Sequence, residues 1–172
     1  MADPVKTTEI DVLTAVVDRL RDQISEFTDS TCFLTSQPLQ SIPSNVRDNL
    51  FCTVSPMSST FEQDVFDGAG ANAICEDAGV YVVVYNAIRL DRVGADTSLL
   101  THASRGLLKI KQDILAALAG HRLVDGSANE LLIREMAPMS ADAINSGQLE
   151  KRPEHVGDMG LVFNTPFEWS LS

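Results

Sequence analysis

The sequence lacks the features by which most enzymes and metal proteins are recognised. Its three cysteines, Cys32, Cys52 and Cys75, are widely spaced, form no Cys-x-x-Cys pair and have no histidine nearby. This spacing indicates neither a disulfide framework nor a zinc site, and we expect reduced, mostly buried thiols. No nucleophile elbow and no phosphate-binding loop with its lysine is present. We therefore predict no catalytic residue, no metal site and no cofactor.

Basic residues are also scarce. Thirteen Lys and Arg stand against 24 Asp and Glu, which gives a formal net charge of -11. A nucleic-acid reader needs a basic patch to meet the phosphates, so this balance argues against one. No apolar run is long enough to cross a membrane, and the polar start Met1–Lys6 lacks the apolar core of a signal peptide. The length of 172 residues favours a single domain over residues 1–172, synthesised in the cytosol and without a membrane partner.

The absence of basic residues is most marked between Asp48 and Ile88, where no Lys, Arg or His occurs. Two strand-like segments, Leu50–Met57 and Val80–Ile88, flank a Ser-, Gly- and Ala-rich connection, Ser58–Gly79. A connection of this length within a compact domain is usually functional or disordered. The pattern predicts a β-hairpin with a long acidic arm at 58–79, whose carboxylates are Glu62, Asp64, Asp67, Glu76 and Asp77. We interpret the last two as an exposed acidic turn rather than as a metal site.

Apolar spacing of three and four residues predicts two helices. The first covers Thr8–Phe27, and Thr8 with Asp11 approximates a capping box at its start. The second covers Ser98–Ala119, with an N-cap among residues 96–98 and a left-handed C-cap at Gly120. The outer face of the second helix is the most basic surface of the chain, and we predict an interface there, formed by His102, Arg105, Lys109 and Lys111.

The remaining segments are predicted to be strands and loops. A short strand at Thr31–Thr35 precedes a Pro- and Ser-rich loop, Ser36–Asn49. A further strand covers Leu131–Pro138, and a polar connection, Met139–Gly157, follows with one helical turn near residues 141–145. The last segment, Gly160–Leu171, has an apolar or aromatic residue at nearly every second position, which is typical of a strand with one buried face.

Pro166 falls on the polar face of that last strand, so we expect the strand to be an edge or to be bulged at this point. The order of elements predicts an α+β fold, in which two helices pack on one face of a mixed or antiparallel sheet that carries a long β-hairpin arm. In a monomer, the acidic arm and the basic helix could face each other or both be solvated. In a cyclic oligomer they could meet between neighbouring subunits.

This layout resembles the tail terminator proteins of long-tailed bacteriophages. The shared features are the helix Thr8–Phe27, the hairpin Leu50–Ile88, the helix Ser98–Ala119, a strand ending at Pro138, and a closing strand that contains Leu161-Val162-Phe163-Asn164 and the aromatic pair Phe167 and Trp169. The resemblance covers nearly the whole chain and is one of element order. The long connections Ser36–Asn49 and Met139–Gly157 depart from the smaller terminators.

The resemblance implies a structural virion protein, assembled in the host cytoplasm and located in the tail or neck. It implies a homohexameric ring that caps the head-proximal end of the tail tube, with the tail tube protein and a neck or connector protein as partners. DNA would pass through an acidic lumen without specific binding. Neck and head-completion connector proteins are one alternative. A ligand-binding domain or enzyme with dispersed residues, drawn from Asp64, Asp67, Glu76, Asp77 and His102, is another.

Overall fold

The computed structural model describes residues 8–37, 50–63, 73–89, 99–123, 135–148 and 154–170. In this part of the chain, one mixed sheet of seven strands has the order β1-β2-β4-β7-β5, with β3 also paired to β4 and β6 to β7. The elements are α1 (Glu9–Gln23), β1 (Cys32–Leu34), β2 (Leu50–Pro56), β3 (Thr60–Gln63), β4 (Ala73–Arg89), α3 (Leu107–Leu118), β5 (Ala137–Ala141), β6 (Asn145–Gln148) and β7 (Glu154–Ser170). The predicted α+β class is confirmed.

Helix α1 begins where the sequence places it. The Thr8 hydroxyl accepts a hydrogen bond from the backbone N–H of Asp11, and the Asp11 carboxylate accepts one from the backbone N–H of Thr8. This reciprocal pair is the predicted capping box, and it satisfies two N–H groups that the first turn leaves unpaired. The helix ends at Gln23, four residues before the predicted end at Phe27.

The second predicted helix is shorter than the sequence suggests. Helix α3 begins at Leu107 with Gly106 as its N-cap, so the predicted start at Ser98 is wrong. A helical turn at residues 99–101 is separated from α3 by a tight turn. A Cβ on Gly106 would lie 2.5 Å from the carbonyl oxygen of Leu100, so this turn requires glycine. At the other end the prediction is confirmed, because Gly120 has a φ of 70° in the left-handed region.

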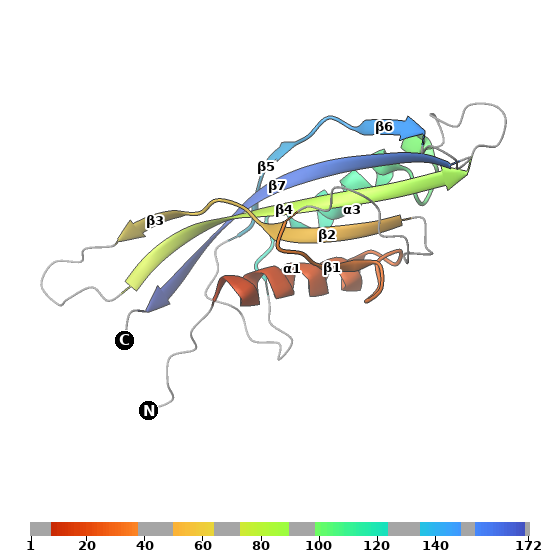
Figure 1. Cartoon of the computed structure of the whole chain (residues 1–172). Coiled ribbons are helices and arrows are strands. Elements are labelled where there is room, and N and C mark those ends of the chain that lie inside the picture. Colours follow the sequence, from red (N-terminus) through yellow and green to blue (C-terminus); the bar gives the residue numbers. More distant parts are fainter. Residues whose placement is uncertain are drawn as a thin grey trace, which may run out of the picture.

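Both helices pack on one face of the sheet and share one apolar core (Figure 1). The strands contribute alternate residues to this face, as a period of two requires. From the two central strands these are Ala78, Val80, Val82, Val84, Met159, Leu161, Phe163 and Phe167. Arg19 of α1 also donates a hydrogen bond from Nε to the carbonyl oxygen of Ala117 in α3. A smaller cluster of Phe51, Val83 and Tyr85 lies on the opposite face.

Two of the three thiols are buried in the main core, as expected. Cys32 of β1 lies directly opposite Cys52 of the parallel strand β2, and both are free. Burial raises the pKa of the Cys52 thiol, and the neighbouring Cys32 raises it further. A neutral buried thiol behaves as a small hydrophobe and is chemically inert. The side chain of Cys75 lies outside the described residues.

In the described part of the predicted arm, 58–79, β3 pairs with the beginning of β4, and residues 64–72 lie outside the described residues. Strands β2 and β3 both pair with β4, and the register advances by one residue between them, from Pro56↔Val80 to Thr60↔Asp77. Such an extra residue is a β-bulge, and it reverses which side chains face the helices. β3, the beginning of β4 and the end of β7 extend past both helices at one end of the molecule (Figure 1). We call residues 60–63, 73–79 and 164–170 the arm.

The C-terminal part corrects two predictions. The strand predicted to end at Pro138 instead begins at Ala137, and residues 131–134 lie outside the described part. The helical turn expected near residues 141–145 is absent there, because β5 and β6 both pair with β7. Pro166 is opposite Asp77 of β4, whereas the β5 ladder reaches only Asn164. The proline therefore lies where the described sheet has an edge, as predicted. Among the described residues, no helix is long and apolar enough to cross a membrane.

Candidate functional site

Glu76 lies in the centre of the arm on the side that faces the helices. Its direct neighbours across the sheet are Phe61 in β3 and Phe167 in β7. Only 7% of Glu76 is exposed, whereas Phe61 is 62% exposed. Partial burial, and then the negative charge of Glu76, raise the pKa of Glu9 in the first turn of α1. The interpretation of Glu76 and Asp77 as an exposed acidic turn is therefore wrong, because both belong to β4.

Asp77 points to the opposite side of the arm from Glu76, since successive strand residues alternate. Its Oδ2 accepts a hydrogen bond of 3.0 Å from Nδ2 of Asn164 in β7. Its buried Oδ1 finds no partner among the described residues. Glu62 lies in β3, and Asp64 and Asp67 lie outside the described part. The structure thus separates the two described arm carboxylates rather than bringing them together.

The four residues of the predicted basic face do not lie on one helix. His102 and Arg105 precede α3, whereas Lys109 and Lys111 lie within it. The Nδ1 atom of His102 accepts hydrogen bonds from the backbone N–H groups of Ser104 and Arg105, at 3.4 and 3.3 Å. These bonds stabilise the turn that ends at Gly106. His102 therefore has a structural role that the helical pattern did not predict.

Lys109 forms an ion pair with Asp113, one turn further along α3. Both groups are partly exposed, so the pair contributes little to stability, but it reduces the positive charge that Lys109 offers to a partner. Arg105 lines a small open cavity of about 220 Å³ together with Glu26, Thr28, Thr31 and Leu50. Glu26 gives this cavity an acidic group beside the arginine, so the cavity does not resemble an anion site.

The described residues contain no group of three potential metal ligands. The hydroxyls that line the Arg105 cavity are used within the fold. Thr31 donates to the carbonyl oxygen of Glu26, and the hydroxyls of Thr28 and Thr31 are 3.2 Å apart. Nothing in this arrangement pairs a nucleophile with a base, as covalent catalysis requires.

A polar surface that the sequence did not predict lies on the sheet face opposite the helices. Tyr81 donates from Oη to a carboxylate oxygen of Asp142, and Asn145 donates to Asp158 at 3.4 Å. Burial raises the pKa of Tyr81, and the hydrogen bond and charge of Asp142 raise it further. Extending the period-two pattern backwards from Gly160 would have placed Asp158 on this face. The partnership with Asp142 depends on the register of β5, which the sequence does not reveal.

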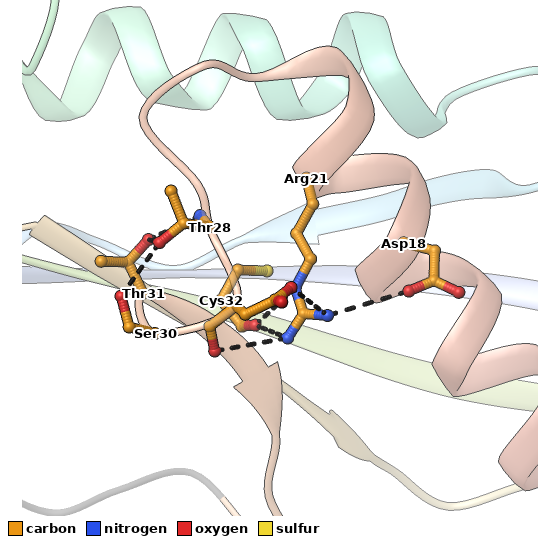
Figure 2. Close-up of polar contacts among 7 residues, drawn as sticks. Asp18, Arg21, Thr28, Ser30, Thr31 and Cys32 are labelled. Carbon is orange, nitrogen blue, oxygen red and sulfur yellow. Dashed lines mark hydrogen bonds and ion pairs between the residues drawn. The ribbon is translucent and has the colours of Figure 1, made fainter.

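One edge of the sheet is closed by an arginine (Figure 2). Arg21, near the end of α1, donates to the carbonyl oxygen of Cys32 in β1 from Nε at 2.9 Å and from Nη2 at 2.5 Å. The N–H of Cys32 donates to the carbonyl oxygen of Thr28. Arg21 also forms ion pairs with Asp18 and Asp29. The backbone groups of Cys32 are thus already satisfied, which protects this edge from pairing with another strand.

Comparisons with known proteins give a likeness in structure but none in sequence. No protein-family model and no curated protein matches the sequence. Among solved structures, the fold is similar to a chain of a structure described as the virion of a native gene transfer agent (GTA) particle, with a TM-score of 0.43 and 16% sequence identity. The likeness covers 92% of this chain and 95% of that chain. At this score it does not establish a shared function.

Proposed function

We propose that the protein is a structural component of a phage-like virion, of the tail terminator type, which forms a homohexameric ring on the head-proximal end of the tail tube. The observation that carries this proposal is the arm, whose outer part extends past both helices, while its residues Ala78 and Phe167 still belong to the core that the helices cover (Figure 1). A projecting element of this kind is suited to contacts between subunits. The ring would stop tube polymerisation and present a docking face to the neck protein.

The acidic surplus fits the passage of DNA through such a ring. The carboxylates of the arm, Glu62, Asp64, Asp67 and Asp77, would face either the lumen or the neighbouring subunit, and Asp142 and Asp158 add charge on the sheet face that bears Asp77. A negatively charged wall repels the phosphate backbone, so DNA slides without specific binding. The buried Glu76, in the centre of the arm, faces the helices and is not part of this acidic wall.

The basic segment would supply a contact to another subunit or to a virion partner. Arg105 forms no ion pair within 4.0 Å among the described residues, so its charge is available, whereas Lys109 is partly neutralised by Asp113. Arg105 and Lys111 are therefore the two cations of this surface that we assign to the contact, with His102 beside them in the turn before α3. Charge reversal at Lys111 should weaken assembly more than charge reversal at Lys109.

The test is to add the purified protein to polymerising tail tube protein. We expect tubes of limited length, with a ring visible at one end in electron micrographs. Tubes of unchanged length with bare ends would overturn the terminator assignment. An unrelated acidic protein of similar size serves as the control for nonspecific charge effects. A ring that ignores tubes and binds the portal or connector instead would favour the neck alternative.

A further inference from the structure

No described strand pairs with the outer edge of β7 in the arm, which we call its free edge. The ladder with β4 continues to Ser170, but the ladder with β5 ends at Asn164. The carbonyl oxygen of Gly160 accepts from the N–H of Asp142, on the β5 side. Backbone groups alternate in direction along a strand, and the β4–β7 register has no shift. The N–H and carbonyl groups of the even-numbered residues of β7 therefore all point to the β5 side. The free edge therefore presents the carbonyl of Pro166, and both the N–H and the carbonyl of residues 168 and 170.

Strand β3 has the complementary free edge. The N–H of Met57 donates to the carbonyl oxygen of Gly79, so odd-numbered residues of β4 direct their backbone groups to the side that carries β2 and β3. Asp77 then bonds with Thr60, its partner in β3. Phe61 and Gln63 consequently point their N–H and carbonyl groups outward, and no described strand pairs with them. The arm thus has two unlike edges, which a heterologous contact requires.

The two edges fit each other in direction. Both β3 and β7 run antiparallel to β4, so they are parallel to each other. Copies arranged by rotation place β3 of one copy beside β7 of the next, also parallel. On the opposite side of the sheet, Arg21 and Thr28 already bind the backbone of Cys32 in β1, so the outward groups of that residue are not free for such pairing.

The register with Phe61 opposite Phe167 uses the outward groups of Phe61 and Gln63 and leaves only the carbonyl of residue 170 unpaired on the β7 edge. In a parallel ladder, the N–H of a residue donates to the carbonyl of the residue before its facing partner. Its carbonyl accepts from the N–H of the residue after that partner. With Phe61 opposite Phe167, it needs the carbonyl of Pro166 and the N–H of residue 168, and both are free. With Phe61 opposite Thr165, it would need the N–H that Pro166 lacks. A slip of one residue would turn Phe61 away from the helix side.

This register also covers an exposed aromatic side chain. Phe61 and Phe167 both lie on the helix side of the arm, because each is directly opposite Glu76. Phe61 is one of the few large apolar residues of the described part that are mostly exposed. Placed opposite Phe167, it would form a cross-strand aromatic pair, which stabilises sheets.

We propose that neighbouring copies join by adding β3 of one arm to the free edge of β7 in the next, with Phe61 opposite Phe167, so that a ring of arms closes without free edges. This inference rests on the proposed ring and names the contact that forms it. Ring closure would remove the exposed strand edges that otherwise favour aggregation.

Two proline variants test this contact. Phe61→Pro removes an outward N–H, and Glu168→Pro removes one from the opposite edge, so neither breaks a bond with β4. Each alone should weaken the contact about tenfold or more, given the typical net value of a backbone hydrogen bond and the bulk of the ring. The matched control Phe61→Thr keeps the N–H and should assemble better than Phe61→Pro. Circular dichroism and melting curves would establish that each variant is folded.

Mixing the two variants gives the sharpest result. Each variant retains one intact edge, so the mixture should form dimers in mass photometry but no rings. Unimpaired rings from Phe61→Pro, or the absence of dimers in the mixture, would overturn the proposed contact. If the wild-type protein still capped tubes in that case, the proposed ring would not be contradicted. A wild-type protein that never assembles, alone or on tubes, would overturn both proposals. If a proline variant still formed rings but no longer bound tubes, the strand edge would be a contact for the tube protein, and this inference would be overturned.

Discussion

Gly160 lies directly beneath the side chain of Tyr81. A Cβ on Gly160 would be 2.1 Å from the Tyr81 Oη and 2.5 Å from the Oδ2 of Asp142. These distances are far shorter than any real contact, so the two side chains would have to separate. Glycine at this position therefore allows the hydrogen bond that links β4 to the turn after β5.

Gly160→Ala should consequently destabilise the protein by about 1–3 kcal/mol, the usual cost of inserting a methyl group into a filled space. Urea unfolding measures the change. Tyr81→Phe is the matched control, because it removes the hydroxyl without adding a clash, and should cost about 0.5–1.5 kcal/mol. Equal stability of Gly160→Ala and the wild type would show that Tyr81 moves freely.

The raised pKa of Tyr81 predicts a dependence of stability on alkaline pH. Its ordinary value is 10.0, and the folded state keeps the phenol neutral to higher pH than the unfolded state does. The contribution of Tyr81 is therefore complete below pH 10 and is lost as the pH rises through the folded pKa. Tyr81→Phe should show a smaller loss of stability above pH 10 than the wild type. Identical alkaline profiles would contradict this.

Glu9 should titrate above the ordinary carboxyl range, because burial and then Glu76 raise its pKa. Its protonated form is favoured on folding, so its contribution is complete below the unfolded pKa and is lost as the pH rises through the folded value. Glu76→Gln should lower the pKa of Glu9 but leave it raised, since burial is the larger cause. NMR titration of the Glu9 carboxyl measures this directly. No change in Glu76→Gln would show that the two carboxylates do not interact.

The cap of α1 gives a local test of the fold. Thr8→Ala removes the hydroxyl that accepts from the Asp11 N–H, and it should cost about 0.5–2 kcal/mol in thermal or urea unfolding. Thr14→Ala is the control, because the Thr14 hydroxyl merely donates to the Ile10 carbonyl within the exposed face of the same helix. A larger loss from Thr14→Ala would mean that the cap is not what stabilises the start of α1.

Arg21 is predicted to stabilise the β1 edge of the sheet and to protect it from pairing with other strands. Arg21→Met should cost about 1.5–3 kcal/mol, the range for hydrogen bonds to charged groups, and should increase aggregation by freeing the Cys32 carbonyl. Asp29→Asn removes an ion pair with a carboxylate that is 95% exposed, so it should be nearly neutral. Light scattering during slow heating distinguishes the two variants.

Periodic segments could be predicted from the sequence, and irregular ones could not. The capping box of Thr8 and Asp11, the C-cap at Gly120 and the alternation from Leu161 to Phe167 all depend on neighbours in sequence, and all are confirmed. The apolar spacing continued across Gly106, which hid the break before α3. Strand β5 has every side chain exposed, so it carries no alternation that a pattern could detect.

The candidate site was less predictable than the fold because it depends on the register between distant strands. The acidic arm residues were visible as composition, but the burial of Glu76 follows from β4 beginning as early as Ala73, which places Glu76 on the same face as Ala78 and Val80. The pairing of Tyr81 with Asp142 requires β4, β7 and β5 to be aligned. Likewise, the unpaired edge at Pro166 becomes informative once the end of the β5 ladder is known.

The most direct test of the central claim is the mass that the protein adds to a tube end. Mass photometry of short tail tubes before and after addition would show a single gain of about 112 kDa per capped end, which is six times the chain mass of 18.7 kDa. The free protein at high concentration should approach the same assembly. No gain, or gains in steps of one chain, would contradict the account of a ring-forming terminator.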